Sequence, residues 1–287
     1  MTPTTTIHSR ALLVWLTISG WSARRYDKQV TNKVNAQYAA STDAGRYNKH
    51  LLPGDAPAYK TLSALLSSIR AQHYTHTLAW SDEGWRLLPT ANYMTYQQWY
   101  RDTRRALDTA VDAFVADYPS MRAQAARLLN GLYKDEDYPT TDDLRSRFRL
   151  DVQYAPLPAA GDIRVDLAND QIATIESTIQ SRVHAATQLA VTDAWTRLHD
   201  VVAHMAERLG DPSAVFRDTL VTNAREICDS LRRLNVTGDP ELEQMRVRVE
   251  RELAMRDPDH LRHDDTLRAQ TATKATAILD AMKGVYV

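Results

Sequence analysis

The feature that most limits what this chain can fold into is a helical repeat of apolar side chains. The repeat comprises Ile172, Ile175, Ile179, Val183, Ala186, Ala190, Ala194, Leu198, Val201, Met205 and Leu209. Its mean step is about 3.7 residues, which is closer to a straight α-helix than to the 3.5-residue repeat of a left-handed coiled coil. We therefore predict one nearly straight helix over about residues 167–209, roughly 60 Å long. Such a helix must project from a domain or act as the spine of a bundle.

Three dipeptides after this repeat predict further helix starts. Asp211-Pro212, Asp239-Pro240 and Asp257-Pro258 each place an acidic residue before a proline. A carboxylate at the N-cap accepts hydrogen bonds from free backbone N–H groups, and proline is well suited to the first helical position. We predict helices over about 212–234, 240–256 and 258–283.

The first half of the chain has a different composition. After Tyr154, Trp195, Phe216 and Tyr286 are the only remaining aromatic residues. Buried or alternating runs predict strands at 11–19, in a hairpin over 77–89, at 148–154, and at Ile163, Val165 and Leu167. We predict the last two strands to pair antiparallel.

Together these patterns predict an α+β fold that is mostly helical. A small, largely antiparallel sheet lies in the N-terminal part, and the long helix leads into a C-terminal helical bundle. The predicted division is an aromatic-rich α+β part at 1–165 and a helical part at 166–287. The sequence leaves open whether the two parts share a single core, because the last predicted strand runs almost directly into the long helix.

Charge and hydropathy limit the classes of partner. The formal net charge is −1 and the sequence pI is about 6.8, so no bulk attraction to nucleic acid or to a membrane is expected. No apolar run reaches the roughly 18 residues that a membrane span requires. A single cysteine, Cys228, cannot form an intramolecular disulfide.

The strongest candidate for a ligand site is a basic and aromatic segment at residues 21–49. Its candidate residues are Trp21, Arg24, Arg25, Tyr26, Lys28, Arg46, Tyr47 and Lys49. Basic groups neutralise phosphates and aromatic rings stack on bases, so this composition suits single-stranded nucleic acid or a nucleotide. The alternative is a solvated helix face with aromatic anchors beneath it, which the near-zero net charge favours.

Motifs that would indicate catalysis are missing from the sequence. The chain has nine glycines and no glycine-rich phosphate loop, and no serine lies in a nucleophile elbow. Histidines occur in pairs, as at His73 and His76, whereas zinc requires three or four ligands. We therefore predict no catalytic residue, no metal and no cofactor. An enzyme in which Asp27, Arg24 and Lys49 meet Trp21 in one pocket stays as an alternative.

Several segments carry a resemblance to a known family. They are Leu16–Lys28, Arg46–Pro53, Pro156–Pro158 with Gly161–Val165, Met205–Leu209 and Phe216–Ala224. In these segments the chain resembles a family of bacteriophage and prophage proteins of unknown function. The resemblance implies a phage-encoded protein of the host cytoplasm, and genes of the family often lie near those of a MoxR-type AAA+ ATPase and a VWA-like protein.

The function predicted from this combination is that of a non-enzymatic interaction or adaptor protein acting in the host cytoplasm. Its long helix offers an extended face for a protein partner, through self-association or through an AAA+ ATPase. The alternative is a single-stranded nucleic-acid-binding protein that uses the basic segment at 21–49. No membrane partner is expected.

Overall fold

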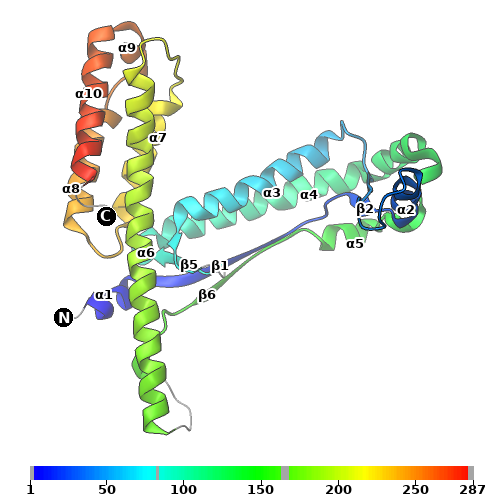
Figure 1. Ribbon diagram of the computed structural model, residues 1–287, viewed down its shortest axis with the longest axis horizontal. Helices are drawn as coiled ribbons and strands as arrows, with labels where there is room; N and C mark the ends of the chain where they lie inside the picture. The colour runs from blue at the N-terminus through cyan, green and yellow to red at the C-terminus, as the bar shows by residue number, and fades with distance from the viewer. Residues whose placement is uncertain (1–2, 82–83, 163–167, 284–287) are drawn as a thin grey trace. The chain divides into compact units, whose positions relative to one another are not determined.

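The computed structural model describes residues 3–81, 84–162 and 168–283. It confirms an α+β fold that is mostly helical, with a small antiparallel sheet near the N-terminus and a long helix followed by further helices (Figure 1). The helices are α1 (Pro3–Arg10), α2 (Lys28–Gln37), α3 (Pro57–His76), α4 (Tyr93–Leu129), α5 (Thr141–Ser146), α6 (Asn169–Gly210), α7 (Thr219–Leu234), α8 (Pro240–Val249), α9 (Pro258–His263) and α10 (Asp265–Met282). The strands are β1 (Ala11–Ser19), β2 (Arg24–Tyr26), β3 (Asn48–His50), β4 (Leu78–Ala79), β5 (Arg86–Pro89) and β6 (Arg149–Ala155). None of the helices in the described ranges combines the length and the apolarity needed to cross a bilayer.

Four strands form the main sheet, in the order β4-β5-β1-β6. Strand β1 pairs antiparallel with β5, with Leu13 opposite Leu87, and β5 pairs antiparallel with β4, with Leu87 opposite Leu78. The predicted strand at 11–19 and the predicted hairpin are both present. A separate two-stranded ribbon pairs β2 with β3, with Arg25 opposite Lys49. The strand predicted at Ile163, Val165 and Leu167 lies outside the described residues.

The chain divides into two compact units, each made of separate segments. The first unit comprises residues 1–16, 73–97 and 152–287, and the second comprises residues 17–72 and 98–151. This division differs from the predicted boundary at 165. Part of the N-terminal sheet belongs to the helical unit because Leu13, Leu78 and Leu87 are buried in the same hydrophobic cluster as the side chains of α6.

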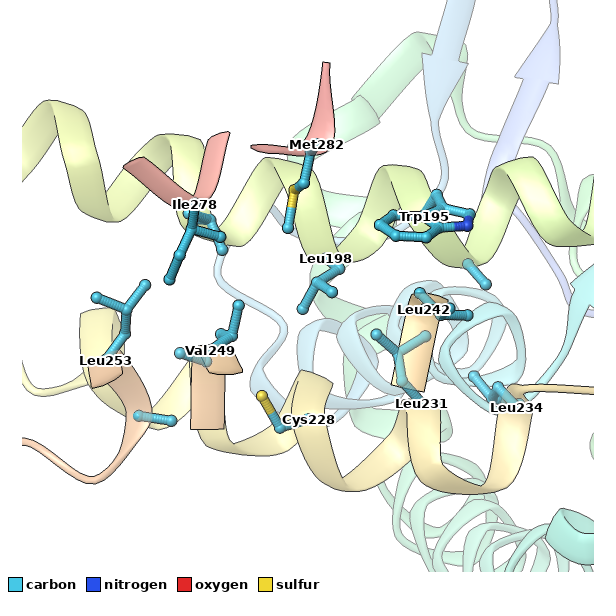
Figure 2. Packing of buried hydrophobic residues seen from close by; sticks show 14 of the residues in the cluster. Trp195, Leu198, Cys228, Leu231, Leu234, Leu242, Val249, Leu253, Ile278 and Met282 are labelled. Atoms are coloured by element: carbon cyan, nitrogen blue, oxygen red, sulfur yellow. The ribbon is translucent and has the colours of Figure 1, made fainter. Parts of the chain in front are cut away.

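In the first unit, α6 is the predicted long helix, uninterrupted over 42 residues. Helices α7 and α10 pack along its C-terminal half (Figure 1). Figure 2 shows Trp195 and Leu198 of α6 pointing toward Leu231 of α7 and Leu242 of α8. The predicted repeat included Val201, but Val201 is only half-buried, and the adjacent Val202, which was not in the repeat, is fully buried.

Two of the three predicted helix starts are confirmed. Asp239 and Asp257 accept backbone hydrogen bonds at the N-caps of α8 and α9. The prediction at Asp211 is wrong, because its carboxylate instead accepts from Ser213 in a local turn and α7 begins only at Thr219. The predicted last helix is divided by Asp264, which caps α10 by accepting from the backbone N–H of Leu267.

In the second unit, α3 and α4 lie side by side (Figure 1), and Tyr59 of α3 contacts Phe114 of α4 with ring centroids 5.4 Å apart. The Trp21 ring lies 5.8 Å from Tyr118 and 6.3 Å from Phe114, centroid to centroid. Helix α4 is continuous through Pro119, although a proline inside a helix favours a break or a kink. The buried packing of Tyr118 and Met121 on either side offsets the hydrogen bond that proline cannot donate.

Candidate functional site

The first unit carries an open apolar groove. It has a volume of about 740 Å³ and lies between α6 and the β4–β5 hairpin. The apolar side chains that line it are Leu13, Trp80, Trp85, Ile179, Val183, Ala185, Ala186 and Leu189, with Pro158 at one edge. Arg182 is the one charged side chain in this described lining, and it is exposed. The groove therefore suits an apolar ligand that carries a negative charge near Arg182.

The wall of the groove on the sheet side is built from tryptophans at the tip of the hairpin. The Trp85 ring packs edge-on against Trp15 of β1 at 5.6 Å. Gly84 adopts a φ of +94°, and a Cβ there would lie 3.0 Å from the Trp15 ring. Glycine is thus required both by the backbone conformation and by the close approach of the tryptophan. This contact fixes Trp85 in place.

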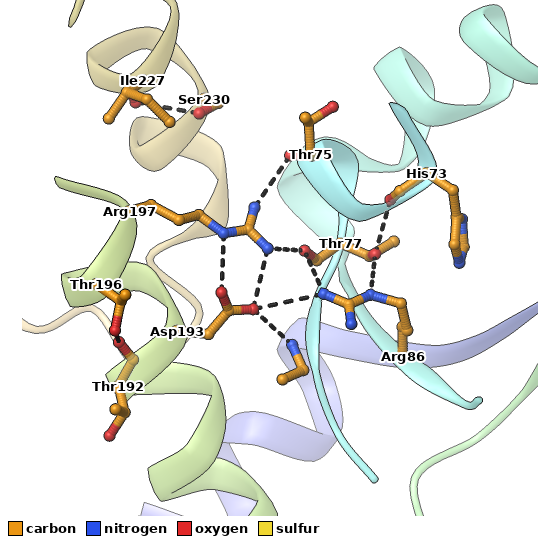
Figure 3. A network of polar contacts seen from close by, with 11 residues as sticks. His73, Thr75, Thr77, Arg86, Thr192, Asp193, Thr196, Arg197, Ile227 and Ser230 are labelled. Atoms are coloured by element: carbon orange, nitrogen blue, oxygen red, sulfur yellow. Dashed lines mark hydrogen bonds and ion pairs between the residues drawn. The ribbon is translucent and has the colours of Figure 1, made fainter. Parts of the chain in front are cut away.

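A polar network holds the hairpin on α6 (Figure 3). The Asp193 carboxylate of α6 accepts from the backbone N–H of Ala79 at 2.8 Å and from Nε of Arg197 at 2.9 Å. It also lies 3.4 Å from Nη2 of Arg86 on β5. Nη2 of Arg197 donates to the carbonyl oxygen of Thr77 at 2.7 Å. Because these bonds join backbone and side chains of both elements, they keep Trp80 and Trp85 in fixed positions beside α6.

The basic segment at 21–49 lies in the second unit, and two of its candidate residues are buried. Trp21 is only 8% exposed and forms part of the aromatic core. Lys49 is 2% exposed, and its Nζ lies 2.6 Å from Asp137 Oδ2 and 3.5 Å from Asp27 Oδ2. Neither residue presents its functional group to solvent, so neither can stack on a base or contact a phosphate without rearrangement.

The remaining candidates in this segment are exposed but dispersed. The guanidinium of Arg46 lies over the Tyr26 ring, 5.7 Å from its centroid. Lys28 is the first residue of α2, and Tyr47 precedes β3. Arg24 and Arg25 lie on β2 and line a separate polar cavity together with Trp21.

The arrangement required by the enzyme alternative is met only in part. Asp27 contacts Lys49, and Trp21 lines a cavity with Arg24, but neither Asp27 nor Lys49 is among the residues that line that cavity. Asp27 caps α2 by accepting from the backbone N–H of Val30 at 3.1 Å. That hydrogen bond holds the pKa of the Asp27 carboxyl below its ordinary value, with Lys49 contributing in the same direction. These contacts give both residues a structural role.

The groove was not identified from the sequence. Its tryptophans were assigned only to a hairpin, and Leu189 lies outside the predicted apolar stripe of the long helix. Leu189 is 43% exposed and Ile175 is 37% exposed, so two large apolar side chains of α6 remain open to solvent. Leu189, an apolar residue next to the predicted apolar repeat, was the sequence signal that could have indicated an apolar surface on this side of the helix.

Comparison of the chain with protein-family models, with curated proteins and with solved structures finds no match.

Proposed function

We propose that this protein is a non-enzymatic interaction protein, an adaptor that binds a segment of a partner protein in the apolar groove beside α6. The observation that carries the proposal is the groove itself, which is lined by Trp80 and Trp85 of the hairpin and by the half-buried Ile179 and the exposed Leu189 of α6. Tryptophan anchors at the centre of an apolar patch are typical of protein-binding sites.

The charge at the groove selects among partners. Arg182 has no ion-pair partner among the described residues, and it lies among apolar side chains. A partner segment that is apolar and carries an aspartate or glutamate beside its apolar residues would pair with this guanidinium. The family resemblance suggests the AAA+ ATPase encoded by the same phage, in the host cytoplasm, as the protein that supplies this segment.

The test is direct binding of the purified chain to the purified ATPase. We expect Leu189→Asp and Ile179→Asp to weaken binding at least tenfold, because each places a charge in the groove. Arg182→Glu should weaken it as well. Val215→Asp is the matched control, because Val215 is 90% exposed and lies outside the groove.

Two results would reject the proposal. One is the absence of binding to the ATPase together with a light-scattering mass that shows no self-association. The other is equal binding by the groove variants and the control. Partner binding that fails only in the groove variants, with circular dichroism unchanged, would support it.

The single-stranded nucleic-acid alternative is left as a proposal with less support. It retains the exposed Arg24, Lys28, Arg46 and Tyr47, whereas the buried Trp21 and Lys49 are engaged within the chain. It predicts that binding of a fluorescent oligonucleotide falls steeply with salt.

A further inference from the structure

A polar cavity in the second unit lies between β2, the turn at 135–140 and α5. Its volume is about 530 Å³, and Arg24, Arg25 and Arg147 contribute three guanidinium groups to its lining. Three carboxylates, those of Glu136, Asp137 and Asp143, lie in the same lining. The formal charges of the lining therefore add up to zero. The charge of the ligand that the cavity binds depends on which of these side chains are already paired within the chain.

Two of the three carboxylates are engaged within the chain. Asp137 contacts Lys49 at 2.6 Å and Nε of Arg25 at 3.4 Å. Asp143 Oδ2 accepts from the Thr140 hydroxyl at 2.8 Å, as part of the N-cap of α5. Lys49 and Arg25 offset the charge of Asp137, whereas Asp143 keeps its charge and uses one oxygen in the bond with Thr140.

The arginines are less engaged than the acids. Arg24 and Arg147 are exposed, and within the described part of the chain neither forms an ion pair. Each guanidinium retains a fork of N–H donors, which matches the geometry of phosphate oxygens. Arg25, with one ion pair at 3.4 Å, also keeps donors available.

Tyr138 contributes a buried side chain to the lining. Tyr138 lines the same cavity and is 6% exposed, and its hydroxyl has no hydrogen-bond partner among the residues that the structure describes. Burial raises the pKa of Tyr138 to about 12, so the hydroxyl keeps its proton at neutral pH. Because this hydroxyl is enclosed, a ligand in the open cavity meets the arginines and not the Tyr138 hydroxyl.

From these groups we propose that the cavity binds a phosphate monoester, that is, a small phosphorylated molecule. Two uncommitted guanidinium groups on one cavity suit an anion with several acceptor oxygens, because each can donate to a different pair of them. This site is independent of the apolar groove, which lies in the other unit.

A single phosphate fits the cavity better than a nucleic-acid strand. The Trp21 ring is packed against Tyr59, Phe114 and Tyr118, so its face is not free to stack on a base. Glu136 is exposed in the cavity lining and repels any phosphate near it, so the lining tolerates one phosphate beside the arginines better than the several phosphates of a strand. Because the lining is neutral in sum, binding should depend on close contacts and only weakly on salt.

The experiment is titration of the full chain with inorganic phosphate and with phenyl phosphate, followed by ³¹P NMR and calorimetry. Arg24→Gln and Arg147→Gln should each weaken phosphate binding about tenfold, since each removes charge-assisted hydrogen bonds. Arg46→Gln is the control, because this arginine belongs to the same basic segment but does not line the cavity.

The proposal is overturned if neither probe binds saturably. It is also overturned if Arg46→Gln weakens binding as much as Arg24→Gln does. Tight, strongly salt-dependent binding of a single-stranded oligonucleotide that Lys28→Gln and Arg46→Gln abolish would assign the segment to nucleic acid instead. Since Arg24 and Arg147 are exposed, both variants are expected to fold, and circular dichroism checks this.

Discussion

Lys49 Nζ lies 2.6 Å from Asp137 Oδ2, and this buried ion pair joins β3 to the turn that precedes α5. The same ammonium donates to the carbonyl oxygen of Leu132 at 2.9 Å and lies 3.5 Å from Asp27 Oδ2. A lysine that the sequence suggested for phosphate contact is thus enclosed by oxygen atoms of its own chain. Its charge is used to hold the basic segment in place.

Lys49→Met should be strongly destabilising. The substitution leaves the Asp27 and Asp137 carboxylates, each with 6% side-chain exposure, without their shared cation. Removing one partner of a buried ion pair costs about 3–5 kcal/mol of the free energy of unfolding. Urea denaturation followed by circular dichroism measures this loss. Lys28→Met, at an exposed position, should change stability by about 0.5 kcal/mol or less.

Asp27→Asn should change how stability depends on pH. The folded chain lowers the pKa of Asp27 below its ordinary value of 3.8, so the carboxylate stabilises the fold above that pH and loses this effect as the pH falls through the lowered folded pKa. Asparagine keeps the capping role at the start of α2 but not the charge beside Lys49. The variant should therefore be less stable than the wild-type chain at pH 7, and the difference should shrink below about pH 4. Denaturation curves at pH 7 and pH 3 that are displaced by the same amount would contradict this.

Tyr138→Phe should stabilise the chain in phosphate-free buffer. Its hydroxyl is buried without a hydrogen-bond partner in the described structure, so its removal recovers a desolvation cost of about 1 kcal/mol. The expected result is a higher urea midpoint with an unchanged slope. Tyr118→Phe is the contrast, because the Tyr118 hydroxyl donates to the carbonyl oxygen of Pro139 at 3.1 Å and its loss should destabilise.

Asp193→Asn should loosen the hairpin that carries Trp80 and Trp85. The change removes the negative charge that Arg86 and Arg197 share, at a cost of about 2–3 kcal/mol. Hydrogen exchange should increase first at the Ala79 amide, which donates to this carboxylate. An exchange rate at Ala79 equal to that of the wild-type chain would contradict the assigned role. Asp200→Asn, at a carboxylate with 71% side-chain exposure, serves as the control.

Local signals in the sequence predicted the regular elements well. The apolar repeat predicted α6 because helical spacing persists over its whole length, and Asp-Pro pairs marked α8 and α9 because the N-cap bonds are local. The predicted start of α7 was wrong, because the Asp211 carboxylate accepts a hydrogen bond from the Ser213 hydroxyl in a local turn. Apolarity did not indicate the buried face of α2, where Thr31 and Asn35 are buried and Val34 is 41% exposed. The Thr31 hydroxyl donates to the carbonyl oxygen of Asp27, and the Asn35 amide donates to the carbonyl oxygen of Thr42.

The candidate sites were harder to predict because both depend on residues that are distant in sequence. The groove combines a hairpin near residue 80 with the helix near residue 185, and the polar cavity combines β2 with Arg147. The composition of the basic segment could not indicate that Lys49 meets Asp137. That pairing follows from tertiary packing and has no local signature.

The interleaved make-up of the two units has a consequence for genetics and for evolution. The chain passes from one unit to the other inside β1, α3, α4 and β6, so every boundary falls within a hydrogen-bonded element. A gene truncated at any of these boundaries would sever a helix or a strand, and no single recombination event could exchange one unit for a homologous copy. The groove and the cavity are therefore expected to be inherited together, and separating what each contributes in a cell will require single-residue alleles.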